Sequence, residues 1–155
     1  MWFEYTLQLL TGLLTPVIAV LTVLIAWRQY KTAKQKLTFD LFDRRLRIYE
    51  DVKNYLLLII RDGDVEFDES SQFRNSVSEA EFLFRKEVIQ YIDTIYQRAI
   101  KLRDWNRQYR DYSQTKPEGY EHDRVTSGIQ IESEWLAAQL ELSKKIFRKY
   151  LDIAK

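Results

Sequence analysis

The chain has 155 residues, and its 24 Lys and Arg nearly balance 23 Asp and Glu, which excludes a strongly basic nucleic-acid coat protein. It contains no Cys and one His, which excludes a disulfide framework, a thiolate nucleophile and a multi-His metal centre. Four Gly, two Pro and 30% charged residues favour one domain of long helices over a turn-rich β fold.

The first element that the sequence predicts is a membrane-spanning helix. No charged residue lies between Glu4 and Arg28, and the 23 residues 5–27 are mostly Leu, Val, Ile and Thr. A helix of this length spans about 35 Å, enough to cross the ~30 Å hydrocarbon core of a bilayer. A cleaved signal peptide is the weaker alternative, because the start MWFEY lacks a basic region and the apolar run is unusually long.

The charges that flank this span predict its orientation. Only Glu4 precedes it, whereas Arg28, Lys31, Lys34 and Lys36 follow it, and basic residues stay on the cytoplasmic side. The four cations are also placed to contact anionic headgroups, so membrane lipid is an expected partner. We therefore expect residues 1–29 to form a transmembrane helix with a short external N-terminus, and residues 30–155 to form a cytoplasmic helical bundle.

Small and polar residues form a stripe along the predicted span. They recur at steps of three and four, which places them on one helix face: Gln8, Gly12, Thr15, Ala19, Thr22 and Ala26. Helices in lipid associate through small residues that permit close approach and through polar groups that bond across the interface. The stripe therefore predicts self-association of the spans. The alternative is that each Thr bonds to its own helix backbone and the small residues are incidental.

The next segment predicts a continuation of the same helix out of the membrane. From Tyr30 to Arg61 apolar residues recur at helical spacing, and Gly63 is available as a left-handed C-cap. The charged residues within 62–84 are mainly acidic. We interpret them as a connection to a helix that begins with the capping box Ser76-Val77-Ser78-Glu79.

Two further helices are expected to complete the bundle. The first runs from about Ser76 to Tyr112, either unbroken or with a break at 82–84, and the second runs from about Arg124 to Ile153. The loop 113–123 connects them. Their apolar faces comprise Val77, Phe84, Val88, Ile92, Ile95, Ala99 and Leu102, and then Trp135, Leu136, Leu140, Ile146, Phe147, Tyr150 and Leu151. The predicted fold class is all-α, with the N-terminal transmembrane helix continuing into a cytoplasmic three- to four-helix antiparallel bundle.

Basic and aromatic residues alternate near the end of the first of these two helices. They form a candidate ligand or phosphate site: Arg103, Trp105, Arg107, Tyr109 and Arg110. Arginines can hold phosphates while aromatic rings stack on bases. Asp104 and Asp111 favour the alternative of an ordinary exposed helix end. We therefore do not expect a nucleotide or nucleic acid as the main partner, although this alternative stays open.

The sequence offers no catalytic motif. It contains no Gly-rich phosphate loop, dinucleotide fingerprint, paired-His helix motif or Ser nucleophile elbow. His122 lies in the predicted loop without a nucleophile at a readable spacing. We expect neither enzymatic activity nor a cofactor or metal.

Residues 36–60, 80–102 and 135–153 contain a "DLFDRR…YE" helix, an "FLF…E…Y" helix and a final "F…YL" helix. In these three segments the chain resembles a widespread family of small uncharacterised bacterial single-pass membrane proteins. The resemblance implies a bacterial inner-membrane protein, and its motifs carry no assigned activity. Together with the flanking charges, this location gives a periplasmic N-terminus and a cytoplasmic C-terminus. Small proteins of this layout are also similar to membrane effectors of antiviral defence systems.

These observations lead to two expectations about function. The favoured one is a non-enzymatic inner-membrane protein whose bundle binds a protein partner or a second copy, as a homo-oligomer or membrane complex. The residues expected to lead the bundle contacts are Tyr49, Val52, Leu56, Phe84, Trp135 and Phe147. The alternative is an oligomerising, toxin-like effector that disrupts the membrane when a partner or signal nucleotide triggers it.

Overall fold

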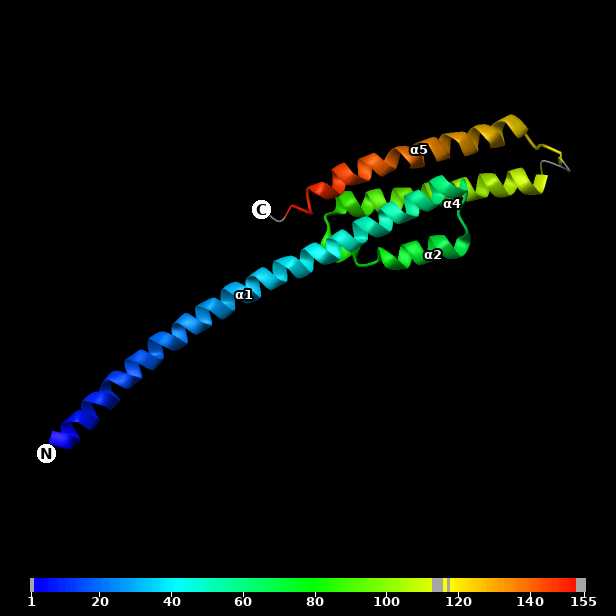
Figure 1. Ribbon diagram of the computed structural model, residues 1–155. Helices are drawn as coiled ribbons and strands as arrows, with labels where there is room; N and C mark the ends of the chain where they lie inside the picture. Colours follow the sequence, from blue (N-terminus) through cyan, green and yellow to red (C-terminus); the bar gives the residue numbers. More distant parts are fainter. Residues whose placement is uncertain (1, 113–115, 117, 153–155) are drawn as a thin grey trace. The chain divides into compact units, whose positions relative to one another are not determined.

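In the computed structural model, all the secondary structure of the described residues is helical, with no strand among them (Figure 1). It describes the backbone of residues 2–112, 116 and 118–152, and the side chains of residues 16–111, 116 and 118–152. The helices are α1 (Trp2–Asp62), α2 (Phe67–Ser76), α3 (Ala80–Leu83), α4 (Lys86–Tyr112) and α5 (His122–Arg148). The predicted all-α fold is confirmed.

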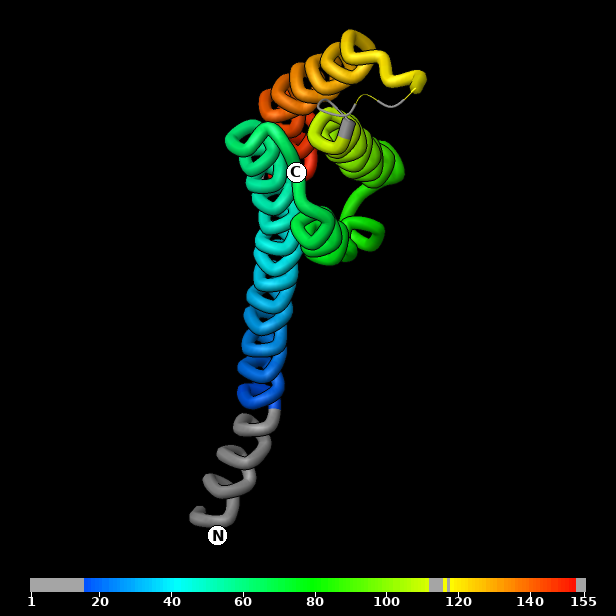
Figure 2. The backbone as a smooth tube through the Cα atoms, turned by 90° about the vertical axis from the view of Figure 1, so that its right-hand side faces the viewer, coloured from blue at the N-terminus to red at the C-terminus, as the bar shows by residue number. Residues whose placement is uncertain are grey.

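The chain divides into two compact units, and α1 contributes to both. The first unit is Met1–Asp40 and the second is Leu41–Lys155. The first unit holds the N-terminal part of α1, and the second holds the rest of α1 with α2 to α5. Figure 2 traces the backbone with colour by residue number, so that each unit can be followed by its residues. The boundary predicted after residue 29 marks the end of the predicted membrane span and not the end of a compact unit, so it stays a prediction.

The hydrophobic core lies within the second unit, where α4 and α5 pack side by side and antiparallel (Figure 1). One face of α1 joins them and contributes Ile48, Val52, Tyr55, Leu56 and Ile59 to the core. All seven residues predicted for the apolar face of the third helix are buried. Of the apolar residues predicted for the last helix, Leu136 and Phe147 are fully buried and the others are half-buried. The bundle therefore closes within a single chain.

The predicted end of α1 is confirmed at Gly63. α1 ends at Asp62, and Gly63 adopts φ +67°, a left-handed conformation that suits Gly. Its amide donates to the carbonyl of Ile59 at 2.8 Å. This bond satisfies one of the last carbonyls of α1 and turns the chain toward α2.

The segment that follows corrects the predicted connection, because it holds two helices. The capping box lies at Glu66 and Glu69, and the proposed box at residues 76–79 is wrong because Ser76 is the last residue of α2. The chain turns again after α3, where Phe84 is extended (φ −128°, ψ 165°). Phe84 is buried, and its ring centroid lies 5.3 Å from that of Phe147. The break at 82–84, which was one of the two alternatives, is confirmed.

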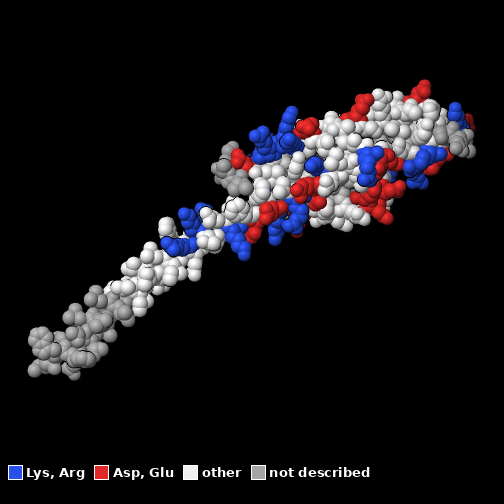
Figure 3. Space-filling model, in the orientation of Figure 1, with Lys and Arg blue, Asp and Glu red and all other residues white. Residues whose placement is uncertain are grey.

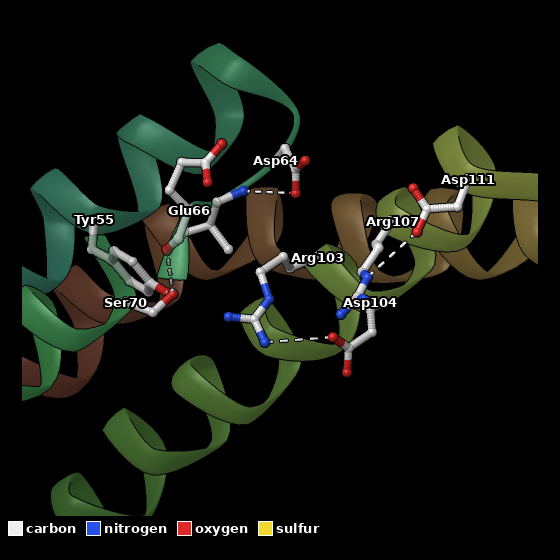
Figure 4. Close-up of polar contacts among 9 residues, drawn as sticks. Tyr55, Asp64, Glu66, Ser70, Arg103, Asp104, Arg107 and Asp111 are labelled. Carbon is white, nitrogen blue, oxygen red and sulfur yellow. Dashed lines mark hydrogen bonds and ion pairs between the residues drawn. The ribbon is translucent and has the colours of Figure 1, made fainter. Parts of the chain in front are cut away.

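A buried hydroxyl pair attaches α2 to α1. The ring of Tyr55 stacks on Phe73 with centroids 4.0 Å apart, and its hydroxyl lies 3.0 Å from Ser70 Oγ (Figure 4). Ser70 Oγ donates its hydrogen to the carbonyl of Glu66 at 3.1 Å, so Tyr55 is the donor in the pair. Burial raises the pKa of Tyr55 to about 12, which keeps the hydroxyl protonated as the bond requires.

The last helix begins earlier and ends earlier than predicted. It starts at His122, which the sequence placed in the loop, and ends at Arg148. Tyr150 and Leu151 follow the helix, yet both still pack against the core. Arg45 of α1 donates to the carbonyls of Leu83 and Tyr150 at 3.2 and 3.4 Å, and so joins the ends of α3 and α5 to α1.

We expect Tyr55→Phe to lower the free energy of unfolding by about 1 kcal/mol, the usual net value of one hydrogen bond. Ser70 keeps its bond to Glu66, so no buried donor is left unpaired. Tyr109→Phe is the matched control, because Tyr109 is 42% exposed. Urea unfolding of the full chain in detergent, followed by circular dichroism, measures both. Equal effects of the two substitutions would show that the Tyr55 hydroxyl does not stabilise the contact of α2 with α1.

Candidate functional site

An exposed apolar band surrounds α1 between Val17 and Trp27. The large apolar residues in it range from 51% exposed at Leu24 to 67% at Val23. At 3.6 residues per turn they occupy every side of the helix except one. That remaining side carries Ala19, Thr22 and Ala26. The band therefore has no charged face. The one side without large apolar residues carries a strip of small residues, Ala19, Thr22 and Ala26.

The described half of the predicted stripe lies on this strip. Thr22 Oγ1 donates to the carbonyl of Ile18 at 2.8 Å, so its hydrogen is already used within α1. The strip consequently offers close approach to a second helix and no free hydroxyl hydrogen. The side chains of Gln8, Gly12 and Thr15 lie outside the described residues, and their part in the stripe stays a prediction.

Within the part of the chain that the structure describes, no helix combines the length and the apolar character that crossing a membrane requires. The side chains of residues 5–15, which belong to the predicted span, are outside that part. The transmembrane helix is therefore not supported by the structure and stays a prediction.

Exposed cations follow the apolar band along α1. Arg28, Lys31, Lys34 and Lys36 are all exposed, and none forms an ion pair with a described carboxylate. The first acidic residue after them is Asp40. These four side chains therefore remain available to an external anion.

The arginines of the candidate phosphate site in α4 are each paired with a carboxylate. Arg103 lies 3.5 Å from Asp104 and Arg107 lies 3.4 Å from Asp111 (Figure 4). Arg110 contacts Asp64, from the connection after α1, at 2.7 Å. A phosphate would have to compete with these carboxylates for the same donors.

The two aromatic residues of this candidate site are used differently. Trp105 packs on α5, where a Cβ added to Gly128 would lie 2.5 Å from the indole atom Cε2. Tyr109 is 42% exposed, and its ring centroid lies 5.7 Å from that of His122. The structure therefore gathers the five predicted residues at one helix end, with Trp105 engaged in helix packing. Ligand binding there stays a prediction.

A second set of exposed cations lies at the end of α5, which the sequence analysis missed. Lys144, Lys145 and Arg148 line a groove of about 680 Å³ with Tyr49. None of the three forms an ion pair with a described residue, and Figure 3 shows Lys and Arg gathered over this end of the helix. Basic residues are usual in the last turn of a helix, so the sequence alone did not distinguish them. Glu141 and Asp152 also line the groove and reduce its positive charge.

A buried carboxylate joins α4 to α5. The side chain of Glu132 is 2% exposed, and its oxygens contact Lys101 Nζ at 2.7 Å and Arg98 Nη1 at 3.1 Å. The Arg98 guanidinium also lies 4.4 Å from the centre of the Trp135 ring. Because both cations are partly exposed, they reach this carboxylate from the surface. The cluster is built for helix pairing, and the sequence analysis missed it because an isolated Glu in a charged helix carries no signal.

A small groove lies between α2 and α4. Its apolar lining consists of Phe73, Val77, Ala80, Ile89, Ile92 and Tyr96, and its volume is about 300 Å³. Arg74 and Asp93 also line it and form a 3.0 Å ion pair. The Arg74 guanidinium lies 4.8 Å from the centre of the Tyr96 ring. We call this feature the α2–α4 groove.

Comparison of the chain with protein-family models, with curated proteins and with solved structures found no match. The resemblance to small bacterial membrane proteins therefore stays a prediction. What the chain does must be argued from its own surfaces.

We expect Gly128→Ala to destabilise the bundle by about 1–2 kcal/mol, although Ala is the better helix former by roughly 1 kcal/mol. The added Cβ would meet the Trp105 ring at 2.5 Å, so the ring must move. Ser127→Ala is the control, since Ser127 is exposed on the same turn. Urea unfolding of the full chain in detergent gives the difference. A Gly128→Ala chain that gains stability would show that Trp105 is not held against α5.

Proposed function

We propose that the chain is a non-enzymatic, single-pass protein of the bacterial inner membrane, in which the helical bundle mediates partner binding or self-assembly. The observation that carries the proposal is the exposed apolar band of α1. A water-soluble surface rarely exposes so much contiguous apolar area. Because the band covers every side of the helix except the strip of small residues, it suits lipid better than a one-sided protein groove.

The order of charges along α1 supports the proposed orientation. Lys and Arg follow the apolar band at 28, 31, 34 and 36, and no acidic residue interrupts them. Cations at this position favour the cytoplasmic side and attract anionic headgroups at about 1 kcal/mol each. The N-terminus would then face the periplasm and the bundle would face the cytoplasm.

Burial limits the surfaces that assembly can use. Val52, Leu56, Phe84 and Phe147 are buried in the core of one chain, and Tyr49 and Trp135 are half-buried against it. They are therefore not free to dock a partner without opening the bundle. Assembly must instead use the strip at Ala19, Thr22 and Ala26 or the exposed surface of the bundle.

The membrane-disrupting alternative requires a polar path along the predicted span. At the one described polar position of the stripe, Thr22, the hydroxyl hydrogen is bonded to Ile18 of the same helix. Because this hydroxyl hydrogen is used within the helix, the arrangement favours packing of the spans against each other over a membrane path lined by free hydroxyl groups. Depolarisation of cells after expression of the chain would favour the alternative instead.

We expect the full chain to stay with membranes during alkaline carbonate extraction, and the double substitution Val17→Arg and Ile18→Arg, near the middle of the predicted span 5–27, to release it. Each charge in the middle of a span costs about 2.5–3.5 kcal/mol on insertion scales. Ile131→Arg is the matched control, because Ile131 is an exposed apolar residue of α5 at 59%. Density-gradient flotation of the extracted membranes measures both. A native chain found in the soluble fraction would overturn the proposed location.

A further inference from the structure

The groove at the C-terminal end of α5 gathers positive charge beside an aromatic ring. Its lining includes three cations, one aromatic ring and one leucine: Lys144, Lys145, Arg148, Tyr49 and Leu151. Its volume of about 680 Å³ exceeds that of the α2–α4 groove and lies within the range of roughly 300–1,000 Å³ that is usual for small-molecule sites. We call it the α5 groove. All its lining residues belong to the second unit, so it is a feature of the bundle alone.

No carboxylate among the described residues neutralises the three cations of the α5 groove. Lys149, the next residue along α5, does have such a partner, because its Nζ lies 3.4 Å from Glu87. The Lys and Arg residues of α4 between positions 98 and 110 are likewise all paired with carboxylates. The cations of the groove therefore differ from those of the neighbouring helix surface.

The end of α5 does not use these cations as hydrogen-bond donors. Basic residues near a helix end can bond to its last free carbonyls. Here the carbonyl of Phe147 already accepts the amides of Tyr150 and Leu151, at 2.9 and 3.2 Å. The carbonyl of Tyr150 accepts a hydrogen bond from Arg45 at 3.4 Å. The three cations make no hydrogen bond to any described residue, so their donors are available to an external anion.

Tyr49 gives the groove a fixed aromatic wall. Its ring is half-buried, and the ring centroid lies 5.5 Å from that of Phe147, so the core holds it in place. Its hydroxyl forms no hydrogen bond with a described residue. Leu151, which also packs against the core, adds an apolar side chain to the lining. The groove therefore combines unpaired positive charge with a flat apolar surface.

We propose that the α5 groove binds a phosphate ester of a small hydroxylated molecule, such as a sugar phosphate or a nucleotide. A phosphate monoester carries about −1.5 to −2 charges at pH 7 and three strong acceptor oxygens, which match the three cations. Arg148 can donate two parallel hydrogen bonds to it, and Lys144 and Lys145 supply compact charges. A single carboxylate has less charge and fewer acceptors, so it would match this set less well.

The two carboxylates of the groove favour a ligand that also carries hydrogen-bond donors. Glu141 and Asp152 line the groove, and with three cations they leave a net charge of +1. They would repel an acidic peptide or a strongly anionic lipid surface. The hydroxyl groups of a sugar can donate to Glu141, while the sugar or base packs against the Tyr49 ring. This mixed lining therefore suits a small polar phosphate ester better than a uniformly anionic partner.

The first experiment tests the phosphate contact by calorimetric titration of the full chain in detergent with adenosine 5′-monophosphate. Arg148→Gln and Lys145→Gln should each weaken binding about tenfold, because each removes one charge-assisted hydrogen bond. Lys149→Gln is the matched control and should bind as the native chain does, since Lys149 pairs with Glu87 and does not line the groove. Adenosine, which has no phosphate, should bind at least about tenfold more weakly. Equal losses in Lys149→Gln and Arg148→Gln, or no binding at millimolar concentration, would overturn the proposal.

The second experiment separates the ring from the charges. Stacking of a base on an aromatic side chain is worth about tenfold or more in affinity. Tyr49→Leu should therefore weaken adenosine 5′-monophosphate by about this factor and leave pyrophosphate binding unchanged, whereas Tyr49→Phe should preserve both. Circular dichroism and the retained pyrophosphate binding show that the variant is folded. Unchanged binding of adenosine 5′-monophosphate to Tyr49→Leu would overturn the stacking contact.

The third experiment locates the ligand and distinguishes a free phosphate ester from a lipid headgroup. The full chain is placed in nanodiscs of phosphatidylcholine, with or without phosphatidic acid, and the acetylation rate of each lysine is followed by mass spectrometry. Adenosine 5′-monophosphate at about ten times its Kd should slow acetylation of Lys144 and Lys145 about tenfold and leave Lys149 unchanged. Protection of Lys144 and Lys145 by phosphatidic acid alone would assign the groove to a lipid and overturn the proposal.

This inference goes beyond the proposed membrane assembly and does not depend on it. A chain that carbonate extracts from membranes would overturn the membrane location and leave the phosphate site intact. A membrane-embedded chain that binds no phosphate ester would overturn the phosphate site and leave the membrane location intact.

Discussion

The burial of one face of α1 between Ile48 and Ile59 is the constraint on which the bundle depends. Val52 and Leu56 are completely buried on it, and they meet α2, α4 and α5 around a common core. Between Val17 and Trp27, the same helix exposes large apolar residues on every side except that of Ala19, Thr22 and Ala26. The chain itself therefore covers the downstream face of α1, whereas the apolar residues of 17–27 are covered only in the proposed membrane location.

Polar groups decide how the remaining helices align on that face. Glu132 fixes the position of α4 relative to α5, because its buried oxygens need Lys101 and Arg98 at once. A buried carboxylate without such partners would be costly, so a shifted alignment of the two helices is disfavoured. Tyr55 and Ser70 do the same for α2. Apolar burial thus supplies most of the stability. A few polar contacts favour one alignment of the helices over others that would bury a similar apolar area.

Helical periodicity was enough to predict the long elements and most of the core. The end of α1 followed from Gly63, whose left-handed conformation is a local property of one residue. α2 could not be predicted in this way, because its ten residues include three Ser and only two apolar side chains, Phe67 and Phe73, and so show little apolar pattern. Its stability comes from Phe73 stacking on Tyr55, a contact between residues distant in sequence. The ion pair between Arg110 and Asp64 could not be predicted for the same reason, since Asp64 reaches Arg110 only after folding.

Ion pairing also distinguishes basic surfaces that look alike in the sequence. Arg103, Arg107 and Arg110 have carboxylate partners, whereas Lys144, Lys145 and Arg148 have none among the described residues. An anion gains more from an unpaired cation, because no existing contact must be broken.

By the same reasoning, an apolar surface that its own chain leaves uncovered points to contacts outside the chain. The band of α1 and the ring of Phe82 meet that condition, and neither contributes to the stability of an isolated copy. In the proposed membrane location, lipid would cover the band of α1.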